Sequence, residues 1–85
     1  MRISQKVLAA QFANVATLAQ RAGVAEAAQW VLYRGTAVYS VVTVDPDTGG
    51  HRTVLPYIGT TRGEAHTYLT VMRETFLLVL REEQA

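Results

Sequence analysis

The chain contains no cysteine among its 85 residues. Disulfide bonds, thiolate nucleophiles and zinc sites with cysteine ligands are therefore excluded. A domain of this size buries only about 60 to 65% of the surface that its unfolded chain exposes, so we expect small stability unless the chain associates with further copies. The lack of cysteine fits a reducing compartment, and we expect a cytoplasmic protein.

Long apolar runs and an excess of one charge are also missing. The apolar run from Phe76 to Leu80 is far too short to span a bilayer. Polar residues interrupt the apolar segment that an N-terminal secretion signal would need, so we expect no such signal. The net charge of +1 gives no strong long-range attraction to nucleic acid or to an acidic membrane. Any partner must therefore be recognised through local surface.

Patterns that support catalysis or metal binding are scarce. Asp45, Asp47 and His51 are the only local group of potential metal ligands. We interpret them as a β-turn with a flanking histidine, because a third acid and the terminal glutamate of a calcium loop are missing. His66 has no acid placed by sequence to orient it as a base. We therefore expect no enzyme activity, no cofactor and no metal site.

Residues 3–22 have the spacing of an amphipathic helix, and Gly23 is a suitable C-terminal cap. Residues 24–33 are ambiguous: the spacing of their apolar residues is helical, whereas residues 30–33 also have the composition of a short strand. We favour a second short helix that ends at Gly35.

Residues 36–45 and 51–58 are rich in valine, threonine and tyrosine, which is typical of strands. The segment between them contains aspartate, proline and glycine, so a β-hairpin is predicted. Pro56 cannot donate a backbone hydrogen bond, and the second strand is therefore expected to be an edge strand or to carry a bulge. The other side of the first strand is then free to continue the sheet.

Residues 61–82 are predicted to form one long helix, opened by a capping box of Thr61 and Glu64. Its expected core face is an arc centred on Met72 that contains Ala65, Tyr68, Leu69, Met72, Phe76, Val79 and Leu80. Val71 and Leu78 lie outside this arc, and Leu77 faces a third direction. A chain this small can cover one apolar face only, so the second face needs another molecule.

These observations predict a single α+β domain over residues 1–85, with an N-terminal helix, a short second helix, a hairpin and a long C-terminal helix, completed by homo-oligomerisation. We expect a small non-enzymatic protein that acts through protein contact, as an adaptor, inhibitor or accessory subunit. The predicted oligomer interface contains Val71, Leu78, Leu77 and Gln11. Gln11 lies within the apolar arc of the first helix, where it either bonds a symmetry mate or a strand carbonyl, or reaches solvent.

Two further surfaces are candidates for binding. Aromatic and arginine side chains are common in protein interfaces, so Trp30, Tyr33, Arg52 and Tyr57 are predicted to contact a protein partner. As an alternative function, the chain could bind a small anion, a nucleotide or nucleic acid at the N-terminus of its last helix. That site would use Thr60, Thr61, Arg62 and Arg34, and Arg52 is expected at the same end of the domain.

Overall fold

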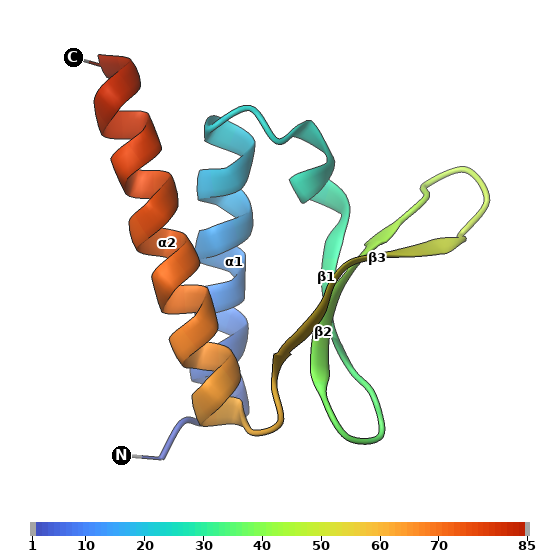
Figure 1. Cartoon of the computed structure of the whole chain (residues 1–85). Helices are drawn as coiled ribbons and strands as arrows, with labels where there is room; N and C mark the ends of the chain where they lie inside the picture. The colour runs from blue at the N-terminus through green and yellow to red at the C-terminus, as the bar shows by residue number, and fades with distance from the viewer. Residues whose placement is uncertain (1, 85) are drawn as a thin grey trace.

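The computed structural model describes residues 2–84 (Figure 1). Its elements are α1 (Gln5–Arg21), the 3₁₀ helix η1 (Ala25–Gln29), β1 (Trp30–Arg34), β2 (Tyr39–Val44), β3 (His51–Gly59) and α2 (Arg62–Gln84). The two long helices lie side by side, run in the same direction and pack on one side of a three-stranded antiparallel sheet (Figure 1). The predicted α+β class, with a helix first and last, is confirmed.

Helix α1 has caps that its sequence supplies at both ends. The Ser4 hydroxyl accepts a hydrogen bond from the Val7 amide at 3.2 Å, which satisfies one of the free amides of the first turn. At the other end Gly23 has a φ of 101°, and the amide of Val24 donates to the carbonyl of Ala19 at 2.9 Å. This is the glycine-centred termination expected from the sequence.

The predicted short helix over residues 24–33 is wrong. Ala25–Gln29 form one 3₁₀ helix, and Trp30–Arg34 form strand β1, which pairs antiparallel with β2. Trp30 and Leu32 pack against the core, whereas Val31 and Tyr33 are exposed, which is the two-residue alternation of a strand. Pairing with β2 supplies the backbone hydrogen bonds that a short isolated helix would have to make alone.

The predicted hairpin is confirmed as β2 and β3, but its sheet is larger than expected. The strand order is β1-β2-β3, so β1 continues the sheet on the side of β2 that was expected to be free for this. Strand β3 carries Pro56 at the edge of the sheet, and its pairing with β2 is irregular between Tyr39 and Val42, as Pro56 predicts. In the turn, the Asp45 carboxylate accepts from the amides of Asp47 at 2.8 Å and Thr48 at 3.3 Å.

The core lies between the helices and the sheet, and α2 contributes buried side chains to the core from its N-terminal half. The central cluster of buried side chains comes from four of the elements: Leu8, Val15, Tyr39, Val41, Ile58, Ala65 and Leu69. Gly59 permits the close approach of β3 to α2, because a Cβ atom there would lie 2.6 Å from the Ala65 amide nitrogen. Within the described residues, neither long helix combines the length and the hydropathy needed to cross a bilayer.

Candidate interaction face on helix α2

The buried side of α2 is rotated relative to the prediction. Ala65 and Leu69 are fully buried, whereas Tyr68 and Val79, both expected in the core, are 38% exposed. The centre of burial is Leu69 and not Met72, a rotation of roughly 60° on a helix of 3.6 residues per turn. The reason is that α2 contacts α1 as well as β3, and the contact with α1 draws the buried side toward that helix.

The opposite side of α2 carries a row of exposed apolar residues, which we call the α2 outer face. Tyr68, Val71, Thr75 and Leu78 form its central row, with alternating spacings of three and four residues. Val71 is 61% exposed and Leu78 is 57% exposed. Two residues border each side of this row: Met72 and Val79 on one side, and Glu74 and Arg81 on the other. The surplus apolar surface is thus wider than the predicted pair of Val71 and Leu78.

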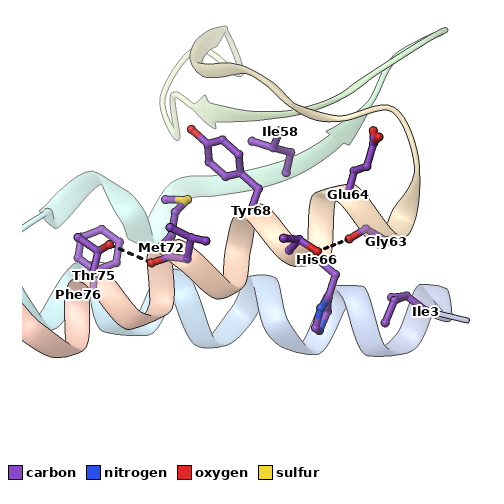
Figure 2. A pocket seen from close by; sticks show the side chains of 11 residues that line it. Ile3, Ile58, Gly63, Glu64, His66, Tyr68, Met72, Thr75 and Phe76 are labelled. Atoms are coloured by element: carbon purple, nitrogen blue, oxygen red, sulfur yellow. Dashed lines mark hydrogen bonds between the residues drawn. The ribbon is translucent and has the colours of Figure 1, made fainter. Parts of the chain in front are cut away.

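A groove of about 1030 Å³ follows the N-terminal half of α2. Its apolar lining includes Ile58 from β3 and Tyr68, Val71, Met72 and Phe76 from α2. Figure 2 shows Tyr68 and Met72 directed to the sheet side of α2, while His66 points the other way, toward α1. The groove therefore opens beside the α2 outer face and continues it toward the sheet.

Two residues of the predicted oligomer interface lie away from this face. Leu77 is 43% exposed, but it points roughly 100° away from Leu78 around the helix. Gln11 is buried between the helices, where its side-chain amide donates to the Thr70 hydroxyl at 3.0 Å. The Thr70 hydroxyl in turn donates to the carbonyl of His66 at 2.8 Å. The amide nitrogen of Gln11 thus has a hydrogen-bond partner within the chain, so a symmetry mate is not needed for it.

The N-terminus of α2 is capped by the chain's own carboxylate. The Thr61 hydroxyl accepts from the Glu64 amide at 3.1 Å, as the capping box predicts. The Glu64 carboxylate accepts from the amide of Thr60 at 2.7 Å and from its hydroxyl at 2.6 Å. These hydrogen bonds, first from the hydroxyl and then from the amide of Thr60, lower the pKa of Glu64. An external anion would have to displace this carboxylate.

The prediction that Arg34, Arg52 and Arg62 share one end of the domain is wrong. Arg34 pairs with Tyr39, and Tyr39 pairs with Gly59 near the start of α2, whereas Arg52 pairs with Thr43 at the opposite end of the sheet. Arg34 lies over the Tyr39 ring, 5.2 Å from its centroid. Arg52 forms a salt bridge with Glu26 of η1. Of the three arginines, only Arg34 and Arg62 therefore remain as candidates for the predicted anion site at the start of α2.

The four residues predicted to contact a protein partner fall on two faces of the sheet. Trp30 packs against the core, and Arg52 reaches Glu26 on the helix side. Tyr33 and Tyr57 are half exposed. Tyr33 follows Leu32 and Tyr57 precedes Ile58, and both of these neighbours pack in the core. Because side chains alternate along a strand, both tyrosines point away from the helices. The two tyrosines lie on the edge strands β1 and β3. Because Trp30 and Arg52 lie on the other face of the sheet, the four residues do not form one surface.

Asp45 belongs to the hairpin turn, and His66 belongs to α2. Asp45 accepts hydrogen bonds from the turn, and His66 is half buried beside the groove. Among the side chains that the structure describes, those of residues 2–82, no three histidine, aspartate or glutamate side chains lie close enough together to hold a metal ion.

The sequence prediction missed that Tyr68 and Val79 belong to the exposed face, although the alternating spacing from Tyr68 to Leu78 was a usable signal. Comparisons of the chain with protein families, with curated proteins and with solved structures found no match. Function is therefore inferred from the geometry of the α2 outer face and its groove.

Proposed function

We propose that the protein is a small non-enzymatic binding protein that associates with a second copy of itself through the α2 outer face. It would act by protein contact, as an adaptor, inhibitor or accessory subunit. The observation that carries the proposal is the exposed row of Tyr68, Val71 and Leu78, with Val79 exposed beside it. Large exposed apolar patches on small domains are typical of interaction sites.

A second copy fits this face because its two halves are complementary. The groove lies beside residues 63–76, in the N-terminal part of α2, whereas Leu78 and Val79 project from the C-terminal part. One copy can therefore supply the side chains that fill the groove of the other. The net charge of +1 causes little repulsion between copies.

A pair of matched substitutions on α2 tests the proposal. Val71→Glu and Leu78→Glu each place a carboxylate in the proposed interface, and both are expected to give a monomer in light scattering on a sizing column. Leu77→Glu is the control, because Leu77 lies on the same helix but points away from the face. Circular dichroism checks that all three variants keep their helices. The proposal fails if Leu77→Glu dissociates the protein while Val71→Glu does not.

Contact with a different protein is proposed for the open side of the sheet, where Tyr33 and Tyr57 are exposed. Aromatic residues provide contact area at low entropic cost. The test is a pull-down that compares the proteins bound by three chains: the wild type, a double variant with Tyr33→Ala and Tyr57→Ala, and the Val71→Glu variant. Loss of a partner from Val71→Glu alone would contradict this placement.

The alternative function as an anion or nucleic-acid binder is not carried forward. The hydroxyl and amide of Thr60 already bond the Glu64 carboxylate, and Arg52 lies at the far end of the sheet. A steep loss of binding to heparin or RNA with rising salt, abolished by Arg62→Glu, would revive it.

A further inference from the structure

The borders of the α2 outer face differ in chemistry. One border carries Met72 and Val79, seven residues apart, and the other carries Glu74 and Arg81, also seven residues apart and of opposite charge. We infer that two copies pair their α2 helices antiparallel, so that Glu74 of each copy faces Arg81 of the other. This inference rests on the proposed self-association and assigns the orientation of the partner.

The seven-residue repeat decides between the two orientations. In a parallel helix pair, the border on one side of the apolar row meets the opposite border of the partner, so Glu74 would face the apolar Val79 of the second copy. In an antiparallel pair, like borders meet. Charged residues then face charged residues of opposite sign, and apolar residues face apolar residues.

One register pairs both borders of the row, and it places Val71 opposite Glu82 of the second copy. When Thr75 packs against Leu78 of the second copy, the same shift places Glu74 opposite Arg81 and Met72 opposite Val79. Each contact occurs twice because the pair is symmetric. The Glu74 side chain is free to take part, since it is 60% exposed although it bonds Arg73 at 2.8 Å.

The groove agrees with the antiparallel arrangement. Antiparallel pairing brings the C-terminal half of one α2, with Leu78 and Val79, beside the N-terminal half of the other, where Tyr68 and Met72 line the groove (Figure 2). Parallel pairing would instead bring the charged border of the second copy, with Glu74, beside the groove.

Charge reversal tests the orientation. Glu74→Lys and Arg81→Glu each create two repulsive pairs in a homodimer, and each variant is expected to dimerise roughly tenfold more weakly than wild type. Mixing the two variants restores two attractive pairs, so a heterodimer with affinity close to that of the wild-type dimer is expected. Analytical ultracentrifugation with one variant labelled measures this preference.

Cysteine cross-linking provides a second readout, because the chain has no cysteine of its own. A mixture of Met72→Cys and Val79→Cys proteins should form a disulfide-linked dimer on mild oxidation, and neither protein should do so alone. Cross-linking of each variant to itself, as strong as in the mixture, would mean that Met72 does not face Val79 of the second copy and would overturn the inference. A wild-type monomer would overturn the proposed function as well, whereas a dimer without heterodimer preference would overturn the orientation only.

Discussion

Helices α1 and α2 lie side by side and share one core, but they differ in what they leave exposed. Helix α1 buries Leu8, Gln11, Val15 and Ala19 in one row, and among its described residues it exposes one large apolar side chain, Val7. Among the side chains of α2 that the structure describes, Ala65 and Leu69 alone are fully buried, and five large apolar side chains are exposed: Tyr68, Val71, Leu77, Leu78 and Val79.

This difference means that α1 keeps more of its apolar surface inside the chain than α2 does. The sheet covers α2 only near its N-terminus, because β3 joins α2 there and the strands then turn away (Figure 1). Beyond Leu69, α2 has no fully buried apolar residue in the part of the chain that the structure describes. Its C-terminal half therefore gains most from a second molecule.

The largest expected effect on stability distinguishes two leucines of α2, of which Leu69 is buried and Leu78 is exposed. In the Val71→Glu background, which is expected to be monomeric, Leu69→Ala should lower the free energy of unfolding by about 2 to 5 kcal/mol. Leu78→Ala should change it by only about 0.5 kcal/mol, because the side chain is exposed. Urea unfolding measures both values. Equal losses would show that Leu78 contributes to the core of the monomer and would remove the contrast within α2.

The attachment of α2 to the sheet depends on Gly59. Its substitution by alanine forces the backbone of α2 away from β3, because the added Cβ would lie 2.6 Å from the Ala65 nitrogen. We expect a loss of about 1 to 3 kcal/mol in urea unfolding. Gly35→Ala is the control, since a Cβ there meets its nearest atoms at an ordinary 3.6 Å. If both substitutions cost the same, the close approach is not the cause.

The link between the two helices is the hydrogen bond from Gln11 to Thr70. A double-mutant cycle with Gln11→Met and Thr70→Val, which keep the side-chain sizes, should give a coupling energy of about 0.5 to 1.5 kcal/mol. The bond from Thr70 to the His66 carbonyl is lost in both arms of the cycle and cancels. A coupling near zero would mean that Gln11 is satisfied in another way.

The caps at the N-termini of the two helices should differ in pH dependence. Hydrogen bonds from Thr60 lower the pKa of Glu64, so the stability that they provide is present above the ordinary carboxyl pKa and is lost as the pH falls through the lowered value. Glu64→Gln should therefore cost stability at neutral pH and little at about pH 3. Ser4→Ala, which removes the uncharged cap of α1, should cost the same at both pH values when urea unfolding is compared. A pH-independent cost of Glu64→Gln would show that its charge is not involved.

The sequence was sufficient where local chemistry decides the structure. The helical spacing of residues 5–21, the glycine after α1, the hairpin turn at Asp45 and the capping of α2 at Thr61 are all local patterns, and all are present. Each depends on residues within a few positions of one another, so the sequence contains the whole cause.

The sequence was insufficient where distant segments decide the structure. Strand β1 exists because β2 pairs with it, and its own five residues do not distinguish a strand from a helix. The buried side of α2 depends on α1 as well as on β3, so a helical wheel alone placed it around Met72. The separation of Arg52 from Arg34 follows from the pairing register, which includes an irregularity that composition does not reveal.

The central claim is that the α2 outer face is covered by a second copy of the chain, and the mass of the wild-type protein in solution tests it most directly. Sedimentation equilibrium over a range of micromolar concentrations is the measurement. The account predicts a mass of at least twice the chain's 9.3 kDa, falling toward the monomer value on dilution. A single species of 9.3 kDa at every concentration would contradict it.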